Sequence, residues 1–228
     1  MRKHYGLIFC FLVSMAYTQS LTVEKIWKQF EFRAKGVAGF NSLSDGAHYS
    51  LMDEKGNLVM VPLDSKEEQP KVLINASDLV WQGQGLTVQD YAFNLQENKV
   101  LLMTDVNPIY RNSYTAVYYL FDLQTKKLSP LSNEMTPQTL AEYSPDGTMV
   151  SFVFKNDLYV KNLSNGKITA ITTDGKKNKV INGTTDWVYE EEFAITKAYS
   201  WSPDSKYLAF LKFVEKGVKE FGIDKYGA

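Results

Sequence analysis

Cysteine and histidine are scarce in this 228-residue chain, and their scarcity excludes several kinds of site. The one cysteine, Cys10, has no second cysteine with which to form a disulfide, and the only histidines are His4 and His48. No cluster of Cys and His residues has metal-ligand spacing, and no glycine-rich phosphate loop occurs. We therefore expect no metal and no other cofactor.

Charge of one sign is also missing, because 25 Lys and Arg residues balance 26 Asp and Glu residues. A nucleic-acid groove or a surface for anionic membranes requires a basic excess, so we expect no nucleic-acid partner. Aromatic residues, in contrast, make up 14% of the chain. Aromatic side chains pack well on half-buried pleated surfaces, which favours an all-β fold.

A long hydrophobic run occurs at the start of the chain, where residues 5–16 follow the positive head Arg2-Lys3-His4. Small residues stand behind it at spacings that a signal peptidase accepts, and the run is too short to cross roughly 30 Å of hydrocarbon. We interpret residues 1–20 as a secretory signal peptide and residues 21–228 as the mature chain, with an uncleaved anchor or a buried first helix as alternatives. We expect export to the periplasm, the cell surface or the medium.

Beyond the signal, residues 21–30 predict a short helix with Thr22 as its N-cap. The rest alternates between turn signals and short hydrophobic strands, and four segments resemble one another. Their opening turns contain, in chain order, Asp45, Glu97, Asp146 and Asp204, at steps of 52, 49 and 58 residues. A repeat of about 50 residues that opens with a turn is typical of the blades of a β-propeller. A sandwich or another all-β fold is the alternative.

Glu190, Glu191 and Glu192 form a carboxylate triplet that interrupts the strand rhythm before the fourth repeat. Consecutive glutamates usually form a solvated face, but these are flanked by large apolar residues. Thr185 or Asp186 is placed to cap a helical turn that carries them. Neighbouring carboxylates in a partly dry site repel each other, and a cation such as a substrate ammonium relieves that repulsion.

Residues 186–192 (DWVYEEE), followed by Trp201-Ser202-Pro203, resemble the double-glutamate motif of the dipeptidyl peptidase IV family in the prolyl oligopeptidase clan. Residues 110–116 (YRNSYTA) resemble the arginine loop of the same family. Residues 156–161 and 121–123 resemble strands near these two motifs. The similarity extends from about residue 21 to the end of the chain.

The resemblance implies an exported serine peptidase with an eight-bladed propeller stacked on an α/β-hydrolase domain, which releases N-terminal X-Pro or X-Ala dipeptides. It implies that Glu191 and Glu192 bind the α-ammonium of a peptide with a free N-terminus, and that Arg111 binds a carbonyl or carboxylate of the same peptide. Four neighbouring residues are expected to support the site: Glu190, Asp186, Trp187 and Tyr189. Of these, Asp186 is expected to cap the helical turn and Trp187 to anchor it by packing.

The nucleophile of this family lies on a Gly-x-Ser-x-Gly elbow, and no such pentapeptide occurs in these 228 residues. We therefore expect about four blades of the propeller, truncated before the hydrolase domain, with no catalytic residue and no peptidase activity of the chain alone. Family members commonly form homodimers. The alternative is an exported propeller that binds peptides or proteins without catalysis.

Overall fold

The computed structural model describes residues 21–34, 39–64, 69–220 and 222, and the chain divides into two compact units between Val37 and Ala38. The expected signal peptide lies outside the described residues. In the first unit, the π-helix η1 (Glu24–Lys28) stands where the sequence predicts a short helix, and Thr22 Oγ1 accepts a hydrogen bond from the Lys25 N–H at 3.2 Å. None of the helices in the described residues is long and apolar enough to cross a membrane.

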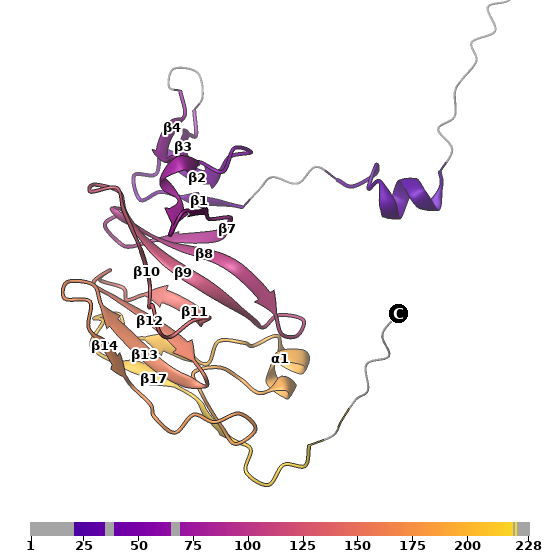
Figure 1. Cartoon of the computed structure of the whole chain (residues 1–228), viewed down its shortest axis with the longest axis vertical. Coiled ribbons are helices and arrows are strands. Elements are labelled where there is room, and N and C mark those ends of the chain that lie inside the picture. Colours follow the sequence, from indigo (N-terminus) through magenta and orange to yellow (C-terminus); the bar gives the residue numbers. More distant parts are fainter. Residues whose placement is uncertain (1–20, 35–38, 65–68, 221, 223–228) are drawn as a thin grey trace, which may run out of the picture. The chain divides into compact units, whose positions relative to one another are not determined.

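The second unit is built from antiparallel sheets that follow one another along the chain (Figure 1). The first sheet, blade 1, has its strands in chain order: β1 (Phe40–Ser42), β2 (His48–Met52), β3 (Leu58–Pro62) and β4 (Lys71–Ile74). A short connection follows, made of η2 (Ala76–Asp78), β5 (Val80–Trp81) and β6 (Gln84–Gly85). Blade 2 again has neighbouring strands in chain order: β7 (Val88–Phe93), β8 (Lys99–Pro108), β9 (Tyr114–Asp122) and β10 (Lys127–Pro130).

Blade 3 repeats this meander with β11 (Thr139–Tyr143), β12 (Met149–Phe154), β13 (Asp157–Asn162) and β14 (Ile168–Ala170). The fourth repeat differs, because it consists of two strand pairs, β15 with β18 and β16 with β17, and contains a helix. Its elements are β15 (Val180–Asn182), α1 (Trp187–Phe193), β16 (Tyr199–Trp201), β17 (Leu208–Phe210) and β18 (Lys212–Val214). The predicted all-β fold of blade-like repeats is confirmed: the described residues form three four-stranded blades and a fourth repeat of two strand pairs.

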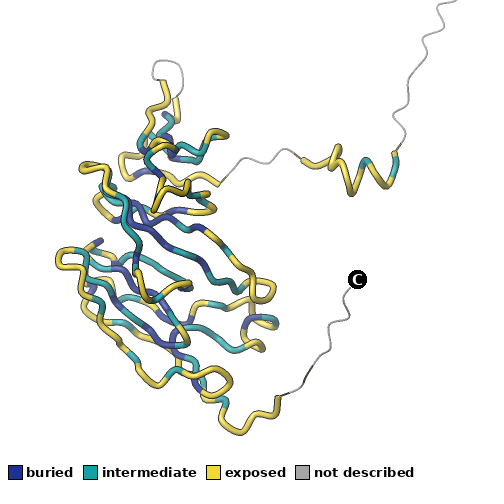
Figure 2. The backbone as a smooth tube through the Cα atoms, in the orientation of Figure 1, coloured by how far each residue is buried: buried dark blue, intermediate teal, exposed yellow. Residues whose placement is uncertain are grey.

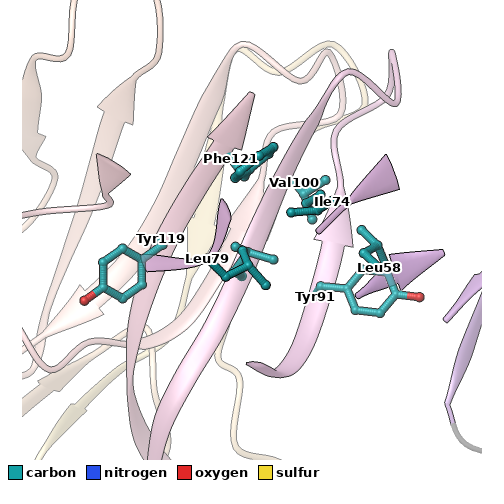
Figure 3. Close-up of a cluster of buried hydrophobic side chains, with 8 residues drawn as sticks. Leu58, Ile74, Leu79, Tyr91, Val100, Tyr119 and Phe121 are labelled. Carbon is teal, nitrogen blue, oxygen red and sulfur yellow. The ribbon is translucent and has the colours of Figure 1, made fainter. Parts of the chain in front are cut away.

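The hydrophobic cores lie between neighbouring blades. Along the backbone, buried residues gather in the strands of the blades, and exposed ones in the turns (Figure 2). Successive side chains of a strand point to opposite faces of its sheet, and blade 2 uses both faces. On β9, Tyr119 and Phe121 pack toward blade 1, whereas Tyr118 and Leu120 pack toward blade 3. Figure 3 shows the first of these cores, where Leu58 and other residues of blade 1 meet Phe121 and its neighbours. A smaller core joins blade 3 to β16.

The opening turns of the four repeats share one backbone geometry, and this geometry corrects their predicted alignment. In each turn, the N–H of a residue with positive φ donates to the carbonyl three residues earlier. These positive-φ residues are Gly46, Glu97, Gly147 and Ser205. Glu97 therefore occupies the glycine position, and Gln96 is the true equivalent of Asp45. Equating Glu97 with the aspartates was wrong by one residue, because the turn in blade 2 has an amide side chain where the others have a carboxylate.

The same turns also link neighbouring blades to one another. The Ser44 N–H donates to Glu97 Oε1 at 2.6 Å, and Gln96 Nε2 donates to the Asp146 carbonyl at 3.0 Å. The Asp146 N–H in turn donates to Ser205 Oγ at 2.9 Å. A row of hydrogen bonds thus joins all four repeats along the end of the sheets where the turns lie.

Candidate functional site

The glutamate triplet lies on an insertion between β15 and β16, whose base is closed by backbone and side-chain bonds. Thr184 and Lys197 form a β-bridge across the base, and Thr185 Oγ1 donates to the Ile195 carbonyl at 2.6 Å. The Ala198 N–H donates to the Gly183 carbonyl at 3.0 Å. The insertion is therefore held as a closed loop above the fourth repeat, and the helix α1 occupies its far end.

Helix α1 begins at a side-chain cap and ends in a left-handed residue. Asp186 is the N-cap, and its carboxylate accepts the Tyr189 N–H at 2.9 Å, which satisfies a donor that has no partner within the helix. Ala194 follows the last helical residue with φ of 54°, and its N–H bonds back to the Glu190 carbonyl. These two bonds fix a helix of seven residues, so the three glutamates point in different directions around its axis.

The hairpin of β8 and β9 approaches this helix with its tip. The two strands are paired as far as Pro108 and Tyr114, and the Ile109 N–H donates to the Ser113 carbonyl at 2.8 Å. Arg111 stands at the centre of the tip with its side chain 75% exposed. Arg111 Nη2 lies 3.5 Å from Glu191 Oε2, and the Glu191 side chain is 17% exposed. The structure therefore brings together Arg111 and Glu191, which the sequence predicts for one site.

Glu192 and Glu190 occupy contrasting positions on either side of Glu191. Glu192 is exposed, and among the described residues it has no hydrogen-bond or ion-pair partner. Glu190 is only 4% exposed, and its Oε1 accepts the N–H groups of Asn112 and Ser113 at 2.8 and 2.7 Å. Burial by itself raises the pKa of the Glu190 carboxyl, but the hydrogen bonds from Ser113 and Asn112 outweigh it and hold that pKa below its ordinary value.

The two aromatic residues that the sequence places in support of the site differ in their surroundings. Tyr189 packs its ring against Phe193 and Phe213, with centroids 5.5 and 5.0 Å apart, so it fastens α1 to the fourth repeat. Trp187 is 55% exposed, which corrects its predicted role as a packing anchor. Trp187 and Glu190 are three residues apart and so lie on the same side of α1, where both line an open cavity; Trp187 is exposed because it borders this cavity instead of packing into a core.

That cavity has a volume of about 790 Å³ and lies on the Glu190 side of α1. Its walls come from the β8–β9 tip, from the beginning of β11, from the β12–β13 turn and from the base of the insertion. Arg111, Glu191 and Glu192 are not part of its wall. The sequence analysis did not predict this cavity or the contacts of Asn112 and Ser113 with Glu190. Those contacts use backbone N–H groups, which leave no signal in a residue pattern.

Metal binding has no support from the described part of the chain, where His, Cys, Asp and Glu residues do not gather in groups of three or more that could hold an ion. The carboxylates of the site instead face a guanidinium and solvent. Chemically, this arrangement can bind an ammonium-type cation at Glu191 and Glu192, beside the guanidinium of Arg111, which binds anions.

Residues 94–228 match the family described as the dipeptidyl peptidase IV (DPP IV) N-terminal region. A dipeptidyl peptidase 4 of Trichophyton rubrum is 35% identical over 196 residues, which are 85% of this chain and 24% of that protein. The prolyl endopeptidase FAP of Mus musculus is 31% identical over 180 residues, covering 78% of this chain and 23% of that protein.

Among solved structures, Porphyromonas gingivalis dipeptidyl peptidase 4 superposes with a TM-score of 0.81 at 33% identity. The match covers 90% of this chain and 29% of that one. The chain thus spans about a quarter of the length of the curated relatives it matches. The insertion and the arginine hairpin both lie within the matched residues 94–228, and the chain belongs to the dipeptidyl peptidase IV family, in its N-terminal propeller region.

Proposed function

We propose that this chain is the substrate-selecting part of an exported serine dipeptidyl peptidase. Glu191 and Glu192 bind the α-ammonium group of a peptide, and Arg111 binds a carbonyl or carboxylate of the same peptide. The observation that carries the proposal is the 3.5 Å approach of Arg111 Nη2 to Glu191 Oε2, which joins two loops from different repeats at one place.

The selection follows from charge and solvation. An ammonium between two carboxylates makes charge-assisted hydrogen bonds, which are about twice as strong as neutral ones. Glu191 is mostly shielded from water, whereas Glu192 is exposed and has no other partner among the described residues. A peptide with an acylated N-terminus offers no ammonium, so the carboxylates lose solvent without gaining a partner. Such an unpaired charge costs several kcal/mol when it is desolvated, roughly a hundredfold or more in affinity.

The site also measures length along the peptide. Because it fixes the amino end, the second peptide bond falls at a constant distance from Glu191 and Glu192, where the hydrolase domain of the intact protein presents its serine. We expect proline or alanine as the second residue of the released dipeptide, as the family resemblance implies. The relatives support the proposal, since those named above include dipeptidyl peptidases, and residues 94–228 match the family model of the DPP IV N-terminal region.

The test uses the full-length gene product and a chromogenic dipeptide with a free amine, such as Gly-Pro coupled to p-nitroaniline. Glu191→Gln and Glu192→Gln each remove one charge at nearly constant shape. Each is expected to lower kcat/KM by about 100-fold or more, which corresponds to the loss of a charge-assisted pair in a site of limited hydration. The unchanged protein should not cleave the N-acetylated substrate.

The matched control is Glu54→Gln, which removes a carboxylate from an exposed turn of blade 1. It should leave kcat/KM unchanged. Equal cleavage of free and acetylated substrates, or near-normal kinetics of both site variants, contradicts the proposal. Binding of free-amine dipeptides without any hydrolysis by the full-length product supports the non-catalytic alternative. Export is tested separately, by sequencing the N-terminus of the protein recovered outside the cytoplasm.

A further inference from the structure

One carboxylate of the site, Glu190, is buried and contacts the backbone of the β8–β9 hairpin tip instead of solvent. Glu190 Oε1 accepts two consecutive backbone N–H groups, those of Asn112 and Ser113, from a hairpin 77 to 78 residues earlier in the chain. The donors directly follow Arg111, and the acceptor directly precedes Glu191. The bond therefore joins the two halves of the site at the residues next to those that would touch a peptide.

The contact of Glu190 with the backbone of Asn112 and Ser113 holds the hairpin tip more firmly than the neighbouring ion pair between Arg111 and Glu191. Glu190 is 4% exposed, and the hydrogen bonds from Ser113 and Asn112 keep the pKa of its carboxyl below the ordinary value despite burial, so it is ionised at neutral pH. Arg111, in contrast, is 75% exposed and lies 3.5 Å from Glu191. Exposed ion pairs of this kind contribute little stability because water and salt screen them. The hairpin tip is consequently held on α1 by Glu190 rather than by Arg111.

The backbone donors also make this link insensitive to side-chain motion. Two successive N–H groups converge on one oxygen only when the tip has a fixed shape, and the Ile109–Ser113 backbone bond fixes that shape at its base. Tyr189 holds the other side of α1 against Phe213. The helix is thus fastened on one face to the fourth repeat and on the other face to blade 2.

We propose that Glu190 is a positioning residue of the peptide site: it sets the distance between Arg111 and the carboxylates of Glu191 and Glu192 by anchoring the hairpin tip to α1. This inference rests on the proposed function. It assigns to Glu190 no contact with the peptide, and it predicts that Glu190 acts through Arg111.

The first test is a double-mutant cycle in the full-length gene product with the free-amine dipeptide substrate. Glu190→Ala is expected to lower kcat/KM by about 100-fold, the effect of displacing a binding group by roughly 1 Å. Arg111→Ala should lower it as well. In the Arg111→Ala background, Glu190→Ala should then cost less than threefold, because the group that it positions is already gone. Additive losses in the double variant overturn the proposal.

The second test measures the link itself by hydrogen exchange at the amides of Asn112 and Ser113. Glu190→Ala should raise their exchange rates by at least tenfold, and Glu190→Gln, which keeps an acceptor oxygen, should restore most of the protection and most of kcat/KM. The matched control is Asp53→Ala, because Asp53 Oδ1 likewise accepts two backbone N–H groups, those of Lys55 and Asn57, in blade 1. It should alter neither the two amides nor kcat/KM.

These outcomes separate the two proposals. If the unchanged protein cleaves free and acetylated substrates equally, the proposed function fails, whatever Glu190 does. If it discriminates between them but the two amides exchange alike in Glu190→Ala and in the unchanged protein, only the positioning role fails. Should Glu190→Ala not fold, the Glu190→Met variant, which keeps the length of the side chain but has no acceptor oxygen, carries both measurements. Unchanged amide exchange in Glu190→Met, together with additive kinetics in the Arg111→Ala background, then overturns the role.

Discussion

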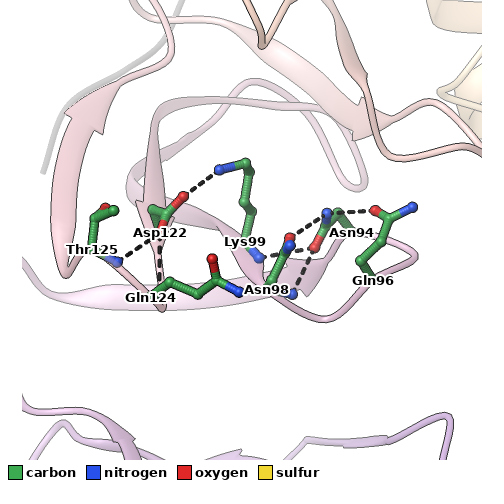
Figure 4. A network of polar contacts seen from close by, with 7 residues as sticks. All are labelled: Asn94, Gln96, Asn98, Lys99, Asp122, Gln124 and Thr125. Carbon is green, nitrogen blue, oxygen red and sulfur yellow. Dashed lines mark hydrogen bonds and ion pairs between the residues drawn. The ribbon is translucent and has the colours of Figure 1, made fainter.

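Asp122 shows how a single carboxylate can hold two strand connections of a blade together. Its Oδ1 accepts the N–H groups of Gln124 and Thr125 at 3.1 and 2.9 Å, which closes the turn from β9 to β10. Its other oxygen forms an ion pair with Lys99 at the beginning of β8 (Figure 4). The bond from Lys99, followed by that from Thr125, lowers the pKa of Asp122 to about 2.

Replacing Asp122 by Asn should make the chain less stable at pH 7, and the difference should disappear in acid. A lowered pKa in the folded state means that the ionised carboxylate stabilises the fold above the unfolded pKa of 3.8, and that this stability is lost as the pH falls toward about 2. Urea unfolding of both proteins between pH 2 and pH 7 measures this. Gln124→Ala, which leaves the backbone donor in place, serves as the control. A difference that stays constant down to pH 2 contradicts the assignment.

Side chains at the same distance in sequence from the opening turn of their repeat also join neighbouring blades. Ser50 of β2 bonds to the Tyr91 hydroxyl of β7 at 2.9 Å, and Ser151 of β12 bonds to the Tyr199 hydroxyl of β16 at 3.4 Å. Between blades 2 and 3 the equivalent of these serines is Leu101, which belongs to an apolar core. The same position is thus filled by a hydroxyl in blades 1 and 3 and by an apolar side chain in blade 2, so the repeats differ in residue type where their geometry agrees.

At the scale of elements, α1 depends on its cap more than on its packing. It has seven residues, and Glu190 is its one buried side chain. Isolated helices of this length are unstable in water, so terminal bonds decide whether the helix forms. Asp186→Ala should cost about 1 kcal/mol, the usual effect of losing an N-cap, and the loss should stay local to the insertion.

Hydrogen exchange at the Tyr189 amide measures this effect directly, because that N–H is the donor to Asp186. It should exchange at least fivefold faster in Asp186→Ala, whereas amides in β8 and β9 should keep their rates. Asp186→Ser restores a capping oxygen and should restore protection. Equal rates in all three proteins contradict a role for the cap.

The sequence predicts the strands of this fold better than it predicts the site. Turn residues and the short hydrophobic runs after them predict strands over residues 58–63, 114–123, 148–154 and 157–162. These agree with β3, β9, β12 and β13 to within one residue at each end, because each strand depends on neighbours in sequence. The motif residues Arg111 and Glu191 are brought together as the resemblance implies. The exposure of Trp187 and the bonds of Glu190 depend instead on the position of a hairpin 77 to 78 residues away, and no local pattern contains that information.

At the scale of the whole second unit, stability resides in the contacts between blades. Each core contains residues of two successive repeats, so a blade is stabilised mainly by its immediate neighbours. This arrangement resembles a linear array, in which a local loss is felt first at the adjoining interfaces. The hydrogen-bonded turns add a second connection along one end.

Phe121 lies fully buried in the core between blades 1 and 2, and Phe121→Ala should therefore cost about 3–5 kcal/mol of unfolding free energy. Because this core is shared by only two blades, amides of β2 and β3 should lose protection first, while those of β12 and β13 should keep most of theirs. Guanidinium unfolding gives the total, and hydrogen exchange resolved by strand gives the distribution. Phe210→Ala, at a side chain 38% exposed on β17, is the control and should cost far less. An equal loss of protection in all blades would mean that the unit unfolds as one cooperative block, since only then does a cavity at one interface lower the stability of every other.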